Sequence, residues 1–188
     1  MGDAKSDRDA ARDGDLRSPR LGYRPITGAD ASRIAHLAGD WDIARMTSRI
    51  PHPYSLIDAD LWIASIEDDE FVRGIELDGE LIGAIGYIES DGGVAEIGYW
   101  IGKPWWGRGF ATEAARAMVD HCFAAGGFRR LTCGHFIDNP RSARVIAKLG
   151  FRRVGKDSQW CEARQAQVAT VRYAMRRPLL SAFWRRAT

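Results

Sequence analysis

The sequence predicts an α+β domain whose central sheet is mixed and mostly antiparallel. Two strand-like segments at 71–90 are joined by an Asp-Gly pair, and a third at 94–102 follows an Asp-Gly-Gly turn. Such tight turns join antiparallel neighbours. The third segment leads through a helical stretch to another strand at 128–137, and a connection of this kind favours parallel pairing.

Length and composition indicate one folded domain. The chain has 188 residues, of which 45% are hydrophobic, which is enough for one core and short for two. Residues 1–18 alternate Asp with Arg or Lys and offer little to bury, so we expect a disordered arm there. A single domain at 19–177 and a C-terminal extension at 178–188 complete the predicted organisation.

Charge and cysteine content argue against several classes of protein. The net charge of +2 gives no strong attraction for a polyanion, which argues against a nucleic-acid partner. No stretch approaches the roughly 18–20 apolar residues of a membrane span. The three cysteines form no CxxC pair, which is typical of reduced thiols in a cytoplasmic protein.

The N-terminal third of the chain is predicted to form a short strand followed by helices. The strand candidate is 21–26, and 27–40 has helical character with Thr27 or Asp30 as its N-cap. After a break that contains two prolines, residues 55–69 place apolar side chains mostly at helical spacing.

The C-terminal half predicts two helices and two closing strands. A helix over 110–125 ends at a Gly-Gly pair, and we expect His121 on its exposed side. A second helix over 139–150 starts with an Asn cap and a proline. Strands near 151–157 and 167–176 follow. The apolar face of the first helix is expected to contain Ala114, Ala115, Met118 and Cys122.

The stretch Gly107-Arg108-Gly109 joins a strand to a helix and predicts an anion site. Glycines let main-chain N–H groups approach a ligand closely, and the first N–H groups of a helix lack internal partners. A diphosphate fits these groups and the positive end of the helix dipole. Arg108 adds a charged donor, and Thr112 adds a hydroxyl.

Other interpretations of this loop compete with the diphosphate site. No Gly-Lys-Ser/Thr follows, which argues against a P-loop nucleoside triphosphatase. No full GxGxxG is present, which weakens a dinucleotide interpretation. An ordinary glycine turn at a helix start is the remaining alternative.

Three stretches together resemble the GNAT superfamily of acyl-CoA-dependent N-acyltransferases. "EIGYWIGKPWWGRGFATEA" at 96–114 resembles its pyrophosphate-binding motif, and "NPRSARVIAKLGFRRVG" at 139–155 resembles its following helix and strand. "LGYRPIT" at 21–27 resembles its opening strand. The best match is the RimJ/RimL-like branch of ribosomal-protein N-terminal acetyltransferases. The resemblance implies the GNAT fold, a twisted sheet with helices on both faces and a V-shaped splay between the two central strands.

The resemblance also implies a reaction and its partners. Acetyl-CoA is the expected co-substrate, with no metal, and the acceptor is a primary amine on a protein N-terminus or a small molecule. The amine would attack the thioester directly in a ternary complex. We expect no membrane partner, and a monomer or a homodimer. Alternatives are a non-catalytic acyl-CoA-binding sensor or assembly module, and a nucleotide-binding regulatory domain.

The cofactor-binding residues are carried over from the family motifs. Trp106 departs from the Gln or Arg that the family often has there, but main-chain groups supply most of the phosphate contacts. The residues expected to contact the cofactor are Ile97, Tyr99, Trp100, Ile101, Trp106, Gly107, Arg108, Gly109, Phe110, Ala111, Thr112, Asn139 and Ser142.

Two residues are predicted to act in catalysis. Glu96 is the candidate general base, directly or through water, and its alternative is an exposed strand residue or ion-pair partner. Many relatives carry a tyrosine acid where this chain has Ile146. Ser142 is therefore the candidate donor to the leaving thiolate, and its alternative is a hydroxyl that satisfies the helix start.

The acceptor residues are the least defined by sequence. Trp41, Tyr54 and Trp62 lie in the segments that cover the acceptor cleft in this family, and His135 lies near the presumed cleft. Core packing is the alternative for the aromatic residues. The four histidines show no metal-ligand spacing.

Overall fold

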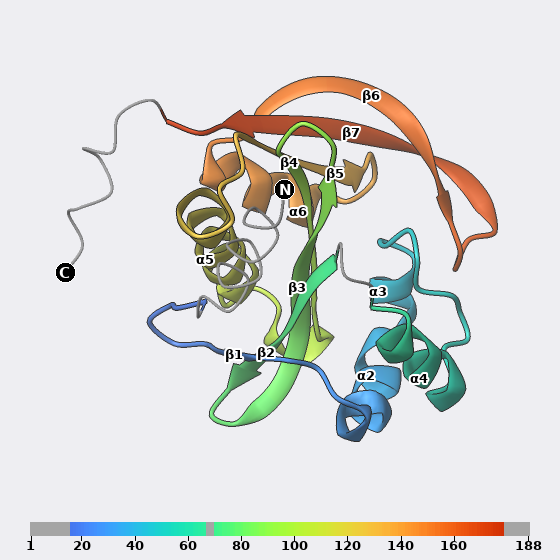
Figure 1. Cartoon of the computed structure of the whole chain (residues 1–188). Coiled ribbons are helices and arrows are strands. Elements are labelled where there is room, and N and C mark those ends of the chain that lie inside the picture. The colour runs from blue at the N-terminus through green and yellow to red at the C-terminus, as the bar shows by residue number, and fades with distance from the viewer. Residues whose placement is uncertain (1–15, 67–69, 179–188) are drawn as a thin grey trace.

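The computed structural model describes residues 16–66 and 70–178, and within these ranges seven strands form one sheet (Figure 1). The strand order across the sheet is β1-β2-β3-β4-β5-β7-β6. The strands are β1 (Gly22–Arg24), β2 (Glu70–Leu77), β3 (Glu80–Ser90), β4 (Val94–Ile101), β5 (Arg130–Phe136), β6 (Arg152–Cys161) and β7 (Ala166–Arg176).

The pairing of the strands confirms the predicted mixed sheet. Strands β2, β3 and β4 form an antiparallel meander, and β5, β7 and β6 pair antiparallel with one another. Strands β4 and β5 pair parallel, as expected for neighbours joined by a helix. The sheet thus consists of two antiparallel groups that meet at one parallel pair.

Helices cover both faces of the sheet (Figure 1). The five α-helices in the described ranges are α2 (Ala31–Ala38), α3 (Trp41–Ala44), α4 (Leu56–Ala64), α5 (Phe110–Ala124) and α6 (Pro140–Leu149). Two short 3₁₀ helices, η1 (Gly28–Asp30) and η2 (Lys103–Trp105), precede α2 and α5. Helices α5 and α6 lie on one side, and α2, α3 and α4 lie on the other. Over the described residues, no helix is long and apolar enough to cross a membrane.

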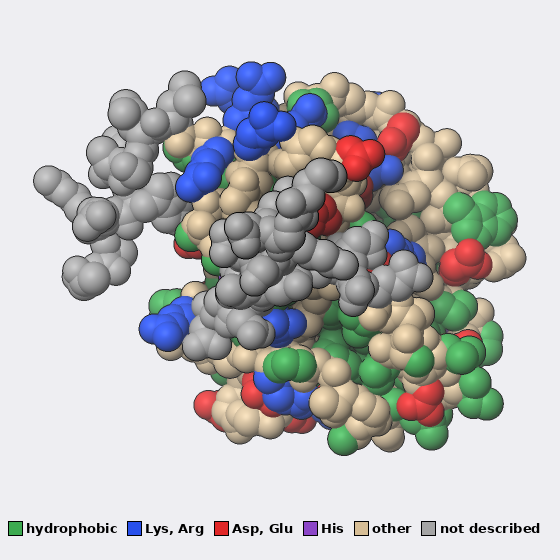
Figure 2. Space-filling view, in the orientation of Figure 1, with side chains coloured by type: hydrophobic (Ala, Val, Ile, Leu, Met, Phe, Trp, Pro, Cys, Tyr) green, Lys and Arg blue, Asp and Glu red, His purple; other side chains and the backbone are tan. Residues whose placement is uncertain are grey.

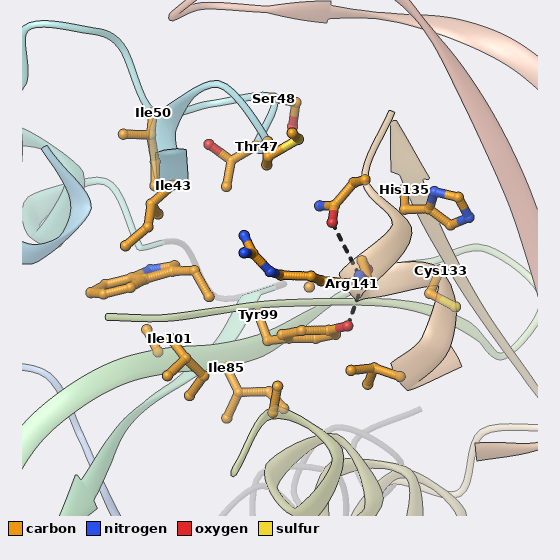
Figure 3. Close-up of a pocket in the computed structure, with 18 of the residues that line it drawn as sticks. Ile43, Thr47, Ser48, Ile50, Ile85, Tyr99, Ile101, Cys133, His135 and Arg141 are labelled. Carbon is orange, nitrogen blue, oxygen red and sulfur yellow. Dashed lines mark hydrogen bonds between the residues drawn. The ribbon is translucent and has the colours of Figure 1, made fainter. Parts of the chain in front are cut away.

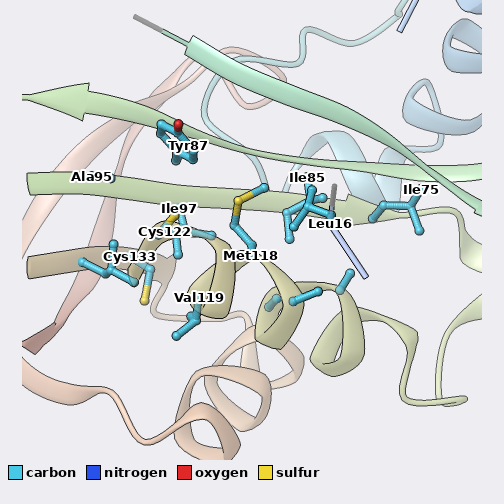
Figure 4. Close-up of a cluster of buried hydrophobic side chains, with 14 of the residues drawn as sticks. Leu16, Ile75, Ile85, Tyr87, Ala95, Ile97, Met118, Val119, Cys122 and Cys133 are labelled. Atoms are coloured by element: carbon cyan, nitrogen blue, oxygen red, sulfur yellow. The ribbon is translucent and has the colours of Figure 1, made fainter. Parts of the chain in front are cut away.

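The main hydrophobic core lies between α5 and the sheet (Figure 4). The predicted apolar face of α5 is confirmed, because all four of its expected residues are buried. A smaller cluster joins α2 and α4 to Leu81 of β3. The side chain of Leu16, which was assigned to the arm, is only 7% exposed and belongs to the main core. The packed domain therefore begins no later than Leu16.

The expected exposure of His121 is wrong. This residue of α5 is 6% exposed, and its ring stacks on Phe71 of β2 with ring centroids 4.8 Å apart. Burial lowers the pKa of the His121 imidazole, which therefore favours the neutral form. More of the surface of α5 is buried than the spacing of its apolar residues indicates, because the aromatic side chain of Phe71 on β2 packs against it.

Replacing Asp120 with asparagine should stabilise the fold in a pH-dependent way. One carboxylate oxygen of Asp120 is buried without a hydrogen-bond partner in the described part of the chain, and burial raises the pKa of this carboxyl to about 6. Because the pKa of the Asp120 carboxyl is higher in the folded state than in the unfolded state, protonation of this carboxyl favours folding at low pH. This contribution to stability is lost as pH rises through about 6. Asp120→Asn should therefore add about 1–2 kcal/mol to the free energy of unfolding at pH 8, allowing for partial exposure.

Urea denaturation at pH 4, 6 and 8 measures this effect. The gain should be much smaller at pH 4, where the folded-state carboxyl is protonated and roughly half of the unfolded-state carboxyl is as well. Asp60→Asn, which changes an exposed aspartate on α4, is the matched control and should show no pH-dependent gain. A gain from Asp120→Asn that is equal at pH 4 and pH 8 would contradict the explanation.

Candidate functional site

A cavity of about 1150 Å³ is lined by residues from both the N-terminal and the C-terminal half of the chain (Figure 3). Its walls are formed by β4, β5, the start of α6, the glycine loop before α5, and the segments around α3 and α4. Figure 3 shows Ile43, Thr47 and Ile50 on one side facing Tyr99 and Arg141 on the other. The cavity therefore joins sequence motifs that are far apart in the chain.

The glycine loop has a backbone that favours glycine at two positions. Gly107 and Gly109 have φ values of 78° and 85°, in the left-handed region that other residues rarely adopt. Gly109 is the N-cap of α5, and its carbonyl accepts from the N–H groups of Thr112 and Glu113 at 3.0 and 3.1 Å. Within the described residues no side chain caps this helix start. Its first N–H groups are thus available to an anion.

Arg20 holds the glycine loop in place through side-chain contacts, and the sequence analysis did not identify this residue. Its Nε donates to Glu113 Oε2 at 2.7 Å, and its Nη1 donates to the carbonyl oxygen of Arg108 at 3.3 Å. Its guanidinium lies 4.5 Å from the centre of the Phe110 ring. The contact spans 93 positions to Glu113, and no local pattern predicts it. Arg108 itself lies over Phe110 and is not among the described residues that line the cavity.

Strands β4 and β5 separate inside the cavity. Their pairing covers only Val94 to Glu96 against Arg130 to Thr132, although both strands continue further. The predicted V-shaped splay is therefore confirmed. The β4 residues beyond it that line the cavity are Ile97, Gly98, Tyr99, Trp100 and Ile101. Cys133, Gly134 and His135 of β5 form the opposite wall.

Most of the other predicted cofactor residues also border this cavity. Trp106 is held by a hydrogen bond from its indole Nε1 to the Ile101 carbonyl at 2.6 Å, and the Arg141 guanidinium lies 4.4 Å from the centre of its ring. The remaining predicted residues that line the cavity are Gly107, Gly109, Phe110, Ala111, Thr112, Asn139 and Ser142.

The start of α6 places Ser142 beside Tyr99. The Asn139 side chain caps the helix, because its Oδ1 accepts from the Ser142 N–H at 3.0 Å. The Ser142 and Tyr99 hydroxyl oxygens are 3.1 Å apart. Figure 3 draws this hydrogen bond as the dashed line that starts at Tyr99. Burial raises the pKa of the Tyr99 phenol to about 12, which keeps it protonated at neutral pH. Ile146 is buried, and its aliphatic side chain offers no proton.

Glu96 lies at the point where the two strands separate. Its Oε1 accepts from Nη1 of Arg172 at 2.9 Å, and Arg172 Nε also donates to Asp157 at 2.8 Å. Gly134 leaves room for the arginine, since a Cβ there would lie 3.2 Å from Arg172 Nη1. The ion-pair alternative for Glu96 is therefore observed, while its role as a base stays a prediction. Arg172 was missed because its partners come from other strands.

Three of the four predicted acceptor residues line the cavity. These are Tyr54, Trp62 and His135. His135 is 9% exposed, its Nδ1 lies 2.8 Å from the Phe136 carbonyl, and its Nε2 lies 3.2 Å from the Tyr173 hydroxyl. Both ring nitrogens are thus engaged. Trp41 packs edge-on against His52, is 45% exposed, and is not among the described lining residues.

Arg164 fixes the acceptor side of the cavity to the sheet. It lies in the turn between β6 and β7, and its Nε donates to the Arg45 carbonyl at 2.7 Å. Its Nη1 forms an ion pair with Asp138 at 2.8 Å. One side chain therefore connects the segment after α3 with the loop that leads into α6. Within residues 16–66 and 70–178, no group of three His, Cys, Asp or Glu residues could hold a metal ion.

Comparisons with known proteins agree with this geometry. The uncharacterized N-acetyltransferase YoaA of Bacillus subtilis is 33% identical over 150 residues, which are 74% of this chain and 84% of that protein. The ribosomal-protein-serine acetyltransferase of Escherichia coli is 38% identical over 74 residues, which are 38% of this chain and 41% of that protein.

Solved structures share the fold. RimJ of Mycobacterium smegmatis superposes with a TM-score of 0.75 and 24% identity over 87% of this chain and 86% of that chain. The ribosomal-protein acetyltransferase RimL gives a TM-score of 0.76 with 18% identity over 86% of this chain and 97% of that chain. The family model described as "Acetyltransferase (GNAT) domain" matches residues 20–152. With this match and the identity to YoaA, the chain belongs to the GNAT acetyltransferases, a family of acyltransferase enzymes.

Proposed function

We propose that this protein is an acetyl-CoA-dependent N-acetyltransferase that transfers acetyl to a primary amine by direct attack in a ternary complex. The observation that carries the proposal is the single cavity that links the uncapped start of α5, the gap between β4 and β5, and the segment around α3 and α4. A long donor and a separate acceptor can occupy such a cavity together. The solved RimJ and RimL structures contain coenzyme A in their complexes, which supports the choice of donor.

The residues at the α5 end fit a diphosphate. The two left-handed glycines let the backbone approach the ligand, and the helix start offers main-chain N–H groups at its positive end. Arg20 and Glu113 hold this loop in place through their ion pair. The pantetheine arm would then follow the separated edge of β4 toward Glu96, where unpaired backbone groups can bind it.

The acetyl thioester would supply the electrophile near Glu96 and Ile97. Attack forms the C–N bond, and negative charge develops on the carbonyl oxygen, where a main-chain N–H of β4 can stabilise it. Glu96 accepts the amine proton, directly or through water. The C–S bond then breaks with its electron pair on sulfur, and the Ser142 hydroxyl donates a hydrogen bond to the thiolate.

The acceptor end of the cavity favours a polypeptide amine over a small one. Helix α4 exposes Leu56, Ile57 and Leu61 at 51%, 69% and 63%, and Leu61 also lines the cavity. Figure 2 shows hydrophobic side chains gathered on the face where α2 and α4 lie in Figure 1. A protein surface can cover such apolar side chains beside its inserted N-terminus. The Escherichia coli relative is named for ribosomal-protein serine acetylation, which agrees with a protein acceptor in the cytoplasm.

Two measurements test this function with the full chain. Acetyl-CoA should raise the melting temperature, whereas ATP and NAD should leave it unchanged. Release of free thiol from acetyl-CoA should then be measured with a panel of N-terminal peptides, polyamines and aminoglycosides. Peptide-dependent release supports the proposal, and release with small amines alone would contradict the polypeptide acceptor. Binding without release for every amine would contradict the enzymatic proposal.

A further inference from the structure

Two hydroxyl groups meet across the cavity where the splayed strand faces α6. Tyr99 comes from β4, Ser142 comes from the first turn of α6, and their oxygens are 3.1 Å apart. Both residues line the cavity, and the Tyr99 ring packs against the main core. The phenol oxygen is therefore held at a fixed place rather than exchanging freely among water partners.

The chemistry of the two groups sets the direction of their hydrogen bond. A serine hydroxyl has one hydrogen and two lone pairs, and so has a tyrosine hydroxyl. The phenol is the more acidic of the two, and hence it is the better donor and the poorer acceptor. Relative acidity thus favours Tyr99 as the donor to Ser142 Oγ, an arrangement that leaves the Ser142 hydrogen free to point into the cavity.

The Ser142 backbone is fixed as well. Its N–H donates to Asn139 Oδ1 at 3.0 Å, which anchors the residue in the first turn of α6. With the main chain held by Asn139 and the hydroxyl oxygen held by Tyr99, the remaining rotation of the Ser142 hydrogen is restricted. Such preorganisation of a donor is what an active site needs where charge develops.

We propose that Tyr99 is a positioning residue for the leaving group: its phenol orients the Ser142 hydroxyl so that this hydroxyl donates to the departing sulfur. This inference rests on the proposed function, because it takes the thioester to lie between β4 and α6. Tyr99 acts through Ser142 and does not itself touch the reacting atoms. A chain of donors from phenol to serine to thiolate strengthens each bond by polarisation.

The pair stabilises the thiolate without giving up a proton. When the C–S bond breaks, its electron pair stays on sulfur, and a thiol has a pKa of about 8.5. A thiolate is too weak a base to deprotonate the Tyr99 phenol, whose pKa burial raises to about 12. The proton lost by the amine goes to Glu96 or water, and the thiolate is protonated from solvent after release. The contribution of the pair is thus a charge-assisted hydrogen bond.

The test is a double-mutant cycle with Tyr99→Phe, Ser142→Ala and the combined variant. Phenylalanine keeps the packed ring and removes only the hydroxyl. Tyr99→Phe should lower kcat about fivefold, and Ser142→Ala should lower it about 30-fold, in line with a neutral and a charge-assisted hydrogen bond. The combined variant should be no slower than Ser142→Ala. Affinity for acetyl-CoA, measured by calorimetry, should stay unchanged in all three.

A second tyrosine–serine pair provides the matched control. Tyr23 donates to Ser18 Oγ at 3.0 Å outside the cavity, and burial also raises the pKa of Tyr23 to about 12. Tyr23→Phe should change the melting temperature about as much as Tyr99→Phe does, and it should leave kcat unchanged.

Three outcomes separate the hypotheses. An active wild type whose Tyr99→Phe variant keeps full kcat would overturn the positioning role alone. So would losses that multiply in the combined variant, because Tyr99 would then act independently of Ser142. A wild-type protein that binds acetyl-CoA but releases no thiol with any amine would overturn the proposed function and, with it, this inference.

Discussion

Replacing Gly109 with valine should weaken acetyl-CoA binding by about 30-fold or more. Gly109 has a φ of 85°, and a β-branched residue in this region carries about 1–3 kcal/mol of strain. Relief of that strain would turn the first N–H groups of α5 away from the cavity. A valine Cβ would also lie 3.5 Å from Nη2 of Arg20, the residue that holds this loop in place. Both effects disturb the loop that the proposed function assigns to phosphate binding.

Gly79→Val separates loss of binding from general strain. Gly79 has a φ of 81° in the turn between β2 and β3, and a Cβ there would meet no heavy atom within 4 Å. Both variants should therefore lose similar thermal stability, while only Gly109→Val loses affinity in titration calorimetry. Equal affinity in the two variants would mean that the diphosphate binds elsewhere.

Replacing Glu96 with glutamine should lower kcat by about 100-fold or more at pH 7. General-base catalysis typically contributes about 10²–10⁴-fold, and glutamine keeps the size of the side chain but cannot accept a proton. The deficit should shrink as pH rises, since a growing fraction of the acceptor amine is then already deprotonated. A pH–rate profile of kcat for both proteins measures this, with the affinity for acetyl-CoA expected to stay constant.

Glu96 also pairs with Arg172, and this contact needs its own control. Asp157 binds the same arginine from β6, so Asp157→Asn disturbs the ion-pair network while leaving the Glu96 carboxylate in place. We expect a loss of less than about fivefold from this change, in line with the small contribution of exposed ion pairs. Losses of equal size in the two variants would assign Glu96 a purely structural role.

Local patterns in the sequence were sufficient for much of the fold and for the cofactor end of the site. The glycine loop, the Asn139 cap and the Asp-Gly turn each depend on neighbouring residues, and each lies where the sequence predicts it. The periodicity of α5 likewise identified its buried face. Helix α3, only four residues long, was not predicted because a single turn is too short for helical periodicity to show in the sequence.

Contacts between distant segments could not be predicted in the same way. Arg20 meets Glu113 across 93 positions, and Arg172 meets Glu96 across 76. Neither pair leaves a trace in local spacing or charge. The prediction that His121 is exposed was wrong for a related reason, because Phe71 of strand β2 covers the His121 ring. Side-chain partners of the site thus depend on tertiary packing rather than on motif chemistry.

The early end of the β4–β5 pairing has a consequence for which donors can react. From Glu96 to Ile101, β4 advances five residues, which is roughly 17 Å at about 3.3 Å per residue. If the diphosphate binds near the start of α5 and the thioester reacts at Glu96, the arm that joins these two groups of the donor must have a length that matches this distance. An acyl thioester with a shortened arm would bind but would not bring its carbonyl to the amine. An arm of another length would hold even the correct acyl group away from Glu96.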